Sequence, residues 1–310
     1  MPSRSPALVR TVLIVAALGL LAVFGTTFVY SRRDQSSRME VAGDPPATNQ
    51  APADHRERRV TGRNMADALA SIDFDRNDPV QVRIFEEYGA VFVASGGAAP
   101  PPSVVFSSDE QVRAWQSTVD VERETLGSYS IELQAPAMKA LLEARAEARA
   151  SRLDITPRAA DAARRSYGDT VRLWTSRVQP ALNHWVANNR IPAAESARIR
   201  ALSPREQIPE VLALEKNGIY FSTQFDKSIL YSVAAPGTSQ HLSMLALDVA
   251  QFENVEVRRI LARHGWFQTV VSDLPHFTYL GVDEDQLPSM GLKKVAVGGR
   301  VFWIPDSTRF

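Results

Sequence analysis

The sequence of 310 residues contains no cysteine. A chain without thiols has neither a disulfide framework nor a thiolate metal ligand, so its fold depends on an ordinary hydrophobic core. Net charge is also absent, because 35 Lys and Arg residues balance 35 Asp and Glu residues. Without a broad basic field, the composition argues against a nucleic-acid partner.

Several motifs of common enzyme classes are missing as well. The chain has no glycine-rich phosphate loop, no nucleophile elbow and no evident internal repeat. Arginines are frequent from Arg145 to Arg177, but they alternate with alanine and other helix formers. That alternation is typical of a solvated helix face.

One stretch of the sequence, residues 11–30, contains no charged residue. About 20 apolar residues suffice for a helix to cross a bilayer. A cleaved signal peptide is the rival interpretation, but the run is longer than a typical signal core and no clear cleavage site follows it. We therefore expect residues 1–10 to be a cytoplasmic N-terminus and residues 11–30 to be an uncleaved transmembrane anchor.

Residues 31–60 are rich in Ser, Asp, Pro and Ala, which predicts a flexible linker. Residues 61–310 would then form an exported domain. Arginines flank both sides of the apolar run and do not settle its orientation, but a large trailing domain is translocated largely regardless of charge. The expected location is the bacterial inner (cytoplasmic) membrane, single-pass, with the domain in the periplasm or outside the cell.

The pattern of apolar residues predicts a change of structure along this domain. Its first half is mainly helical, with helices after Ser108, over residues 136–149, and over residues 159–186 with an interruption near Pro180. From Gly218 onward, short runs of aromatic and β-branched residues predict strands, with a helix capped by Asn254 between them.

Residues 295–303 resemble a terminal hairpin that turns at Gly298 and Gly299. Together these signals predict an α+β fold, in which helices pack on a small, mainly antiparallel C-terminal sheet preceded by one transmembrane helix.

Two segments of the second half carry the side chains of a possible metal site. Residues 244–250 read as a buried strand with one charged residue, Asp248, and a buried carboxylate needs a partner or a metal. His241 precedes this strand after a turn, and His276 follows downstream. Histidine and carboxylate side chains are the usual three protein ligands of a catalytic zinc ion. Asp273, three residues before His276, is placed to accept a proton.

The pattern S-x-H-x(6)-D, followed by an acid-x-x-H pair and an aromatic residue, resembles the zinc D-alanyl-D-alanine carboxypeptidases of the VanY type, within the LAS metallopeptidases. The resemblance covers about the last third of the chain. The matching residues are Ser239, His241, Ala246, Asp248, Val249, Trp266, Asp273, His276, Phe277, Tyr279 and Gly281.

This resemblance implies a metallopeptidase-like core at about residues 150–310, with Zn²⁺ held by His241, Asp248 and His276. It implies that Asp273 takes the place of the catalytic base. The sequence departs from the family at two positions: Met244 stands where the family usually has glycine, and Asp273 stands where it usually has glutamate.

The family also uses an arginine, at the end of an earlier strand, to hold substrate or developing negative charge. Residues 153–158 are similar to such a strand and end in Arg158, which we take as the second catalytic residue. Arg164 and Arg165 are its rivals.

Each candidate residue also has a simpler interpretation. The two histidines and Asp248 would also suit a buried hydrogen-bonded cluster without a metal, Asp273 a turn before Pro275, and Arg158 a solvated surface. The helical pattern around His184 and the helix end at His264 explain those two histidines without a metal.

The leading hypothesis is a membrane-anchored zinc metallopeptidase that cleaves D-alanyl peptide bonds in peptidoglycan stem peptides. Its expected partners are the stem peptide and, through the anchor, the membrane. The alternative is a catalytically weak or inactive module with the same fold that binds peptidoglycan or a partner protein. Endopeptidase action on cross-links would differ only in the shape of the cleft.

Overall fold

The computed structural model describes residues 63–309, which belong to one compact unit. The expected cytoplasmic segment, anchor and linker, residues 1–60, lie outside the described residues. Within residues 63–309, no helix has both the length and the apolar character needed to cross a membrane.

The first part of the described chain is helical. Its elements are α1 (Met65–Ala70), α2 (Pro79–Tyr88), the 3-10 helix η1 (Gly89–Val93) and α3 (Asp109–Gln116). The Asp78 carboxylate accepts the N–H groups of Val80 and Gln81 at the start of α2, and the Ser108 hydroxyl accepts an N–H at the start of α3. Such caps satisfy donors that a helix leaves free at its first turn. The predicted helix after Ser108 is therefore confirmed.

A hairpin that the sequence analysis missed follows α3. Strands β1 (Val121–Leu126) and β2 (Tyr129–Gln134) pair antiparallel and turn at Gly127, which has a φ of +66°. Most residues of β1 are exposed and three of its six are charged, so the alternation of apolar and polar residues that marks a half-buried strand is absent. Helix α4 (Ala135–Ala150) then confirms the helix predicted over residues 136–149.

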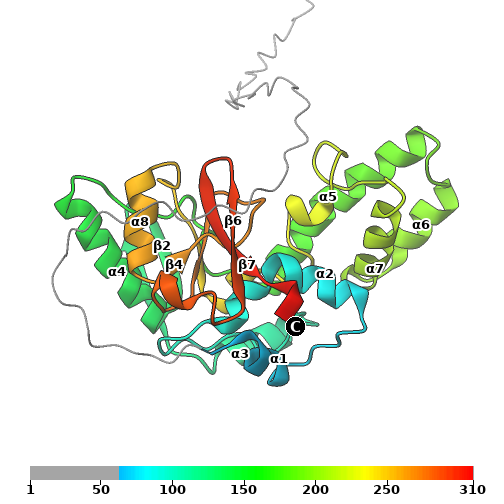
Figure 1. Ribbon diagram of the computed structural model, residues 1–310. Coiled ribbons are helices and arrows are strands. Elements are labelled where there is room, and N and C mark those ends of the chain that lie inside the picture. The colour runs from blue at the N-terminus through cyan, green and yellow to red at the C-terminus, as the bar shows by residue number, and fades with distance from the viewer. Residues whose placement is uncertain (1–62, 310) are drawn as a thin grey trace, which may run out of the picture. The chain divides into compact units, whose positions relative to one another are not determined.

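The prediction of a long helix over residues 159–186 is wrong in two respects, the residue at which it begins and its interruption near Pro180. Helix α5 (Tyr167–Ala187) begins eight residues later, where Ser166 and Asp169 form a reciprocal capping box. It continues through Pro180 without a break. Pro180 has no N–H to donate to the carbonyl oxygen of Ser176, four residues earlier. Both residues are exposed, so water can bond to that oxygen instead. Helices α6 (Ala193–Ala201) and α7 (Pro204–Glu215) pack against α5 (Figure 1).

The strands of the C-terminal half form two small antiparallel sheets. The first has the order β3 (Ala246–Asp248), β5 (His276–Tyr279), β4 (Trp266–Phe267), and the second is the hairpin β6 (Leu292–Val297) and β7 (Arg300–Pro305). The predicted terminal hairpin with its Gly298-Gly299 turn is confirmed. The strand signal from Gly218 onward is wrong at its start, because residues 218–245 form turns and the 3-10 helices η2 (Ile229–Tyr231) and η3 (Gln240–Ser243).

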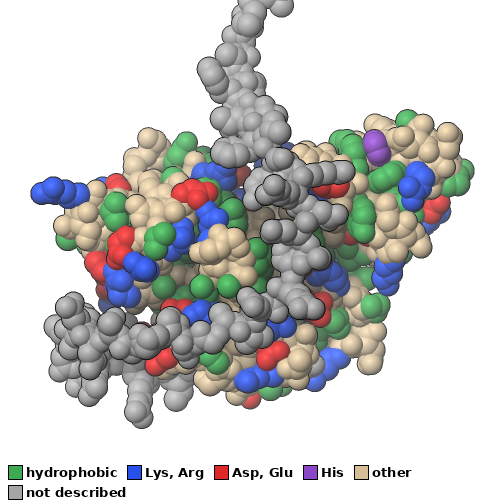
Figure 2. All heavy atoms as spheres, turned by 45° about the horizontal axis from the view of Figure 1, so that its top comes forward, with side chains coloured by type: hydrophobic (Ala, Val, Ile, Leu, Met, Phe, Trp, Pro, Cys, Tyr) green, Lys and Arg blue, Asp and Glu red, His purple; other side chains and the backbone are tan. Residues whose placement is uncertain are grey.

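Helix α8 (Val255–Arg263), capped by Asn254 as predicted, packs against both α4 and β4, and Figure 1 shows α4 and α8 side by side. The 3-10 turns η4 (Glu284–Gln286) and η5 (Ser307–Arg309) complete the chain. The fold is therefore a mixture of helices and small antiparallel sheets, as the α+β prediction states. On the face drawn in Figure 2, basic and acidic side chains are interspersed, in keeping with the balanced composition.

Candidate metal centre

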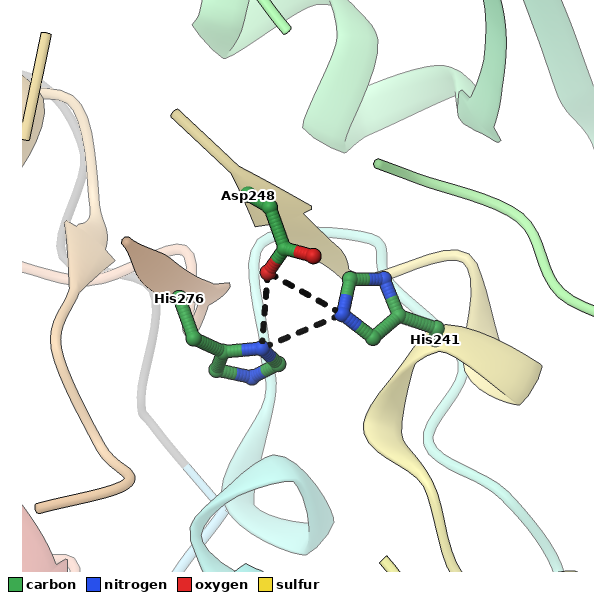
Figure 3. Close-up of side chains that lie close together, drawn as sticks. All are labelled: His241, Asp248 and His276. Atoms are coloured by element: carbon green, nitrogen blue, oxygen red, sulfur yellow. Dashed lines mark hydrogen bonds and ion pairs between the residues drawn. The ribbon is translucent and has the colours of Figure 1, made fainter. Parts of the chain in front are cut away.

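The structure brings together the three side chains that were predicted from the sequence as metal ligands. The antiparallel register of β3 and β5 sets Asp248 directly opposite His276, and η3 carries His241 to the same place. One ligand atom from each side chain lies within 4.8 Å of the others (Figure 3). Both histidines are buried and Asp248 is nearly so.

The turn that carries His241 depends on two positions with positive φ. Gly237 has a φ of +79°, and a Cβ there would lie only 2.0 Å from the carbonyl oxygen of Phe106. Met244 ends η3 with a φ of 56°, in the left-handed region that favours glycine. Because the turn needs a positive φ at residue 244, glycine would fit this position with less backbone strain than the Met244 of this chain. The Met244 side chain is fully buried and does not line the cavity beside the metal ligands.

Hydrogen bonds to protein oxygens determine which ring nitrogen of each histidine carries a hydrogen. His241 Nδ1 lies 2.8 Å from the carbonyl oxygen of Ala163, which can only accept, so Nδ1–H donates and Nε2 keeps a free lone pair. His276 Nε2 lies 2.8 Å from Gln240 Oε1. Because Gln240 Nε2 donates to the carbonyl oxygen of Tyr88, Oε1 must face His276, and His276 Nδ1 also keeps its lone pair.

The two free lone pairs and a carboxylate oxygen converge on one point. His241 Nε2 lies 3.2 Å from His276 Nδ1. Asp248 Oδ1 lies 3.3 Å from His241 Nε2 and 3.4 Å from His276 Nδ1. Asp248 Oδ1 is buried without a hydrogen-bond partner among residues 63–309, whereas Oδ2 accepts from Arg165 Nη2 at 2.8 Å. Three acceptors that face one another without a hydrogen repel unless a cation lies between them.

These separations fit zinc. Nitrogen and carboxylate ligands bind zinc at about 2.0–2.2 Å in a tetrahedral arrangement, which sets neighbouring ligand atoms roughly 3.3–3.5 Å apart. The observed separations are 3.2, 3.3 and 3.4 Å. The donor set and its spacing therefore suit a zinc ion with a fourth position left open.

The protonation states of the ligands suit a cation as well. Burial lowers the pKa of His241 below its ordinary value despite the neighbouring Asp248 carboxylate, so the ring is neutral at neutral pH. Burial by itself would raise the pKa of Asp248, but its interactions with His241 and His276 hold it well below the usual value. A neutral imidazole and an ionised carboxylate are the forms that bind metals.

A cavity of about 290 Å³ opens beside the three ligands. Asp273, the proposed base, is exposed and lines this cavity, and its carboxylate has no hydrogen-bond partner among the described residues. Arg158 also lines it, with its guanidinium 5.9 Å from the ring centre of Phe252. Residues 153–158 do not form the expected strand before a helix; their one β-type pairing is an isolated antiparallel bridge from Pro157 to Val249.

The three candidate arginines have different surroundings. Arg164 bonds to Glu132 and Gln116 and does not line the cavity. Arg165 both lines the cavity and bonds to Asp248, so this rival of Arg158 makes direct contact with one of the candidate ligands. Arg177 from α5 is a third arginine at the cavity. Its helical neighbours gave no signal of such a role.

Two residues that orient His276 escaped the sequence analysis. Gln240 Oε1 also accepts a hydrogen bond from the Thr278 hydroxyl, and the Thr269 hydroxyl lies 3.4 Å from the same amide. Gln240 stands immediately before His241, but its contact with His276 spans 36 residues of sequence. The two histidines set aside earlier lie elsewhere: His184 stacks on Phe225, and His264 Nε2 lies 2.8 Å from Glu147.

Comparison with known proteins gives a limited likeness. No protein-family model matches the chain, and no curated protein matches it. Two solved structures do: VanYB in complex with D-alanine-D-alanine (18% identity, TM-score 0.31, covering 53% of this chain and 80% of that chain), and a Zn(II) complex of a variant of the vancomycin resistance D,D-pentapeptidase VanY from a VanB-type resistance cassette (19% identity, TM-score 0.29, covering 53% and 82%). At these TM-scores the likeness carries no argument for function, which rests on the residues themselves.

Proposed function

We propose that the protein is a zinc metallopeptidase that cleaves D-alanyl peptide bonds in peptidoglycan stem peptides, in the manner of a D-Ala-D-Ala carboxypeptidase. The proposed metal site is based on one observation: two histidine lone pairs and Asp248 Oδ1 converge at the spacing of a tetrahedral zinc site. The D-alanyl substrate rests on the sequence pattern from Ser239 to Gly281 that resembles the VanY type.

His241, Asp248 and His276 would hold the zinc ion. When bound, zinc supplies Lewis-acid polarisation of a carbonyl and acidifies a water molecule. Asp273, at the exposed side of the same cavity, would accept a proton and return it to the leaving amine. Aspartate is one methylene shorter than the glutamate usual in the family, so its reach into the cavity is smaller.

Cationic side chains at the cavity suit a substrate that ends in a carboxylate. Arg158, Arg165 and Arg177 all line it. Guanidinium groups bind carboxylates through paired, charge-assisted hydrogen bonds. Since Arg165 is already bonded to Asp248, Arg158 and Arg177 are the side chains with more freedom to meet the substrate.

The proposal includes the place of action. Residues 11–30 would anchor the chain in the bacterial inner membrane, with residues 61–310 in the periplasm or outside the cell, where peptidoglycan lies. Protease protection in sealed spheroplasts checks this: external protease should digest the domain, whereas protection would contradict export.

The function is tested with the purified chain by measuring bound zinc and the release of D-alanine from a pentapeptide ending in D-Ala-D-Ala. One zinc per chain is expected, with release abolished in His241→Ala. Asp273→Ala should keep the zinc and lose at least about a hundredfold in kcat, the usual contribution of a general base. His184→Ala, which removes a histidine stacked on Phe225, is the matched control and should keep both zinc and activity.

A binding module with the same fold is the second candidate, and the exposed, unbonded Asp273 carboxylate favours it. It predicts bound zinc and pentapeptide binding without turnover, and equal behaviour of the chain and Asp273→Ala. Turnover that needs Asp273 rules it out. A chain without bound zinc contradicts the metal site itself, and with it the peptidase.

A further inference from the structure

A second cavity, of about 520 Å³, is lined by residues of α8, β4 and the β6–β7 hairpin. Figure 1 shows where these elements lie in the fold. Strand β5 separates it from the metal centre. His276 lines the metal-centre cavity and its neighbour Phe277 lines the second one, because successive side chains of a strand point to opposite faces. The proposed peptidase reaction uses no residue of this reverse-face cavity.

Buried donors without acceptors are concentrated at the reverse-face cavity. Among residues 63–309, three buried side-chain polar atoms have no hydrogen-bond partner. One is Asp248 Oδ1 at the metal centre. The other two are Trp266 Nε1 and Arg300 Nε, and both residues line the reverse-face cavity. An unsatisfied buried donor is costly, and an oxyanion would satisfy it.

Arg258 adds a guanidinium that no carboxylate neutralises by direct contact. Its Nη1 donates to the carbonyl oxygens of Phe252 and Glu253, and no ion pair joins it to a carboxylate of the described residues. Burial, together with the charge of the neighbouring Arg300, lowers the pKa of Arg258. The charge of Glu253, which pairs with Arg300, opposes this shift but makes no direct contact with the Arg258 guanidinium.

The remaining charges of the cavity are balanced within the protein. Each of the other cations has an acidic partner: Arg259 with Glu256, Arg263 with Glu147 and Glu256, Lys294 with Glu284, and Arg300 with Glu253. Asp283 is a further acid of the lining. The attraction for an anion is therefore local to Arg258 and the free Nε of Arg300, rather than spread over the cavity.

Two exposed apolar side chains also line the cavity. Val255 is 50% exposed and Val301 is 39% exposed, and both line the cavity. They are two of the four large hydrophobic residues exposed in the described part of the chain. An apolar group seated there would remove this surface from water.

We propose that the reverse-face cavity binds an amphiphilic oxyanion, a carboxylate or phosphate attached to an apolar group. The oxyanion accepts hydrogen bonds from the guanidinium groups of Arg258 and Arg300, and the apolar group packs against Val255 and Val301. This site is independent of the metal centre and of its proposed reaction.

Tryptophan fluorescence is the readout, because Trp266 and Trp303 both line the cavity. The purified chain is titrated at constant ionic strength with hexanoate and hexyl phosphate, and with acetate and inorganic phosphate as matched probes without an alkyl chain. At least one hexyl probe should give a saturable change, at least about tenfold tighter than its short counterpart. The stronger of the two hexyl probes identifies the head group as carboxylate or phosphate.

Arg258→Gln and Arg300→Gln should each weaken binding about tenfold, as expected for a lost charge-assisted hydrogen bond. Arg172→Gln, which removes one exposed arginine of α5 outside the cavity, is the matched control and should bind as the unchanged chain does. Val301→Ser alters an exposed side chain and should weaken only the hexyl probes.

Thermal unfolding confirms that each variant is folded. The proposal is overturned if no probe gives a saturable change, if Arg172→Gln weakens binding as much as Arg258→Gln and Arg300→Gln, or if folded Val301→Ser binds the hexyl probes unchanged. Because zinc content and D-alanine release are measured separately, failure of this site leaves the peptidase proposal standing, and the converse also holds.

Discussion

At the scale of single residues, the chemistry of the candidate metal centre depends on which ring nitrogens carry hydrogen. Ala163 and Gln240 hold the outer nitrogens of the two histidines as donors, which leaves the inner nitrogens free to bind a cation. Partners of this kind orient metal ligands and raise their basicity. Gln240 acts through His276 and is therefore a positioning residue.

Gln240→Leu removes the acceptor that orients His276 and should weaken zinc binding by about ten- to a hundredfold, the usual cost of losing such a partner. A competition titration against a chelator measures the affinity. Gln240→Glu keeps an acceptor for His276 Nε2–H and serves as the matched variant, with affinity closer to that of the unchanged chain. Equal zinc affinity in Gln240→Leu and the unchanged chain would show that Gln240 does not position His276.

At the scale of elements, the turn that connects η3 to β3 sets the distance between His241 and Asp248. Met244 closes η3 with a left-handed backbone and a fully buried side chain. The backbone conformation costs a non-glycine residue about 1–2 kcal/mol, whereas burial of the side chain is favourable. Met244 therefore combines a strained backbone conformation with a well-packed side chain at this turn.

The two contributions separate when Met244→Ala is compared with Met244→Gly. Both variants lose the buried side chain and should unfold more easily than the unchanged chain. Because only glycine relieves the strained φ, Met244→Gly should be more stable than Met244→Ala by about 1 kcal/mol in denaturant unfolding. The opposite order, which is usual where φ is negative, would contradict the role of the backbone.

A second connection links the end of α4 to residues 153–158, which lead to Arg158 at the cavity beside the metal centre. Arg145 and Arg149 both bond to Asp154, and hydrogen bonding to Arg145 lowers the pKa of that carboxyl from 3.8 to about 2, although partial burial opposes the shift. A folded-state pKa below the unfolded value stabilises the folded state above the unfolded pKa. This stabilisation is lost as the pH falls through the folded-state pKa.

Asp154→Asn should therefore be less stable than the unchanged chain at neutral pH. The difference in the free energy of unfolding should shrink between about pH 4 and pH 2, as the carboxyl of the unchanged chain becomes protonated. Denaturant unfolding at a series of pH values measures it. A difference that stays constant over this interval would show that the ion pairs do not set the pKa of Asp154.

At the scale of the whole molecule, the three candidate ligands come from η3, β3 and β5, elements that are assembled only in the folded chain. A metal ion that binds all three stabilises the folded state, since the unfolded chain offers no such site. Zinc binding and the stability of the domain should therefore be coupled.

At a free zinc concentration 100 times the dissociation constant, the stabilisation is about 2.7 kcal/mol, which raises the Tm of a domain of this size by roughly 5–10 °C. Thermal unfolding with added zinc and with a chelator measures the shift. The shift should disappear in His241→Ala and persist in His184→Ala. A Tm that does not respond to zinc in the unchanged chain would contradict a metal held by these three residues.

The sequence by itself determined the features that depend on neighbouring residues. Caps at Ser108 and Asn254, the Gly298-Gly299 turn and the propensity of α4 were readable because each acts within a few residues. The buried carboxylate of Asp248 and the spacing of the two histidines likewise named the candidate ligands. Whether they bind zinc stays a prediction.

Only the tertiary structure decided which distant residues meet. The bond from His241 to Ala163 spans 78 residues, and the bond from Arg165 to Asp248 spans 83. Such contacts orient the candidate ligands and bring Arg165 next to Asp248, yet no local sequence pattern predicts these contacts. The exposed strand β1 lacks the alternation that marks a strand, and the reverse-face cavity exists only where α8 meets the last hairpin. Periodicity and capping report local energetics, whereas these features depend on packing between segments far apart in the chain.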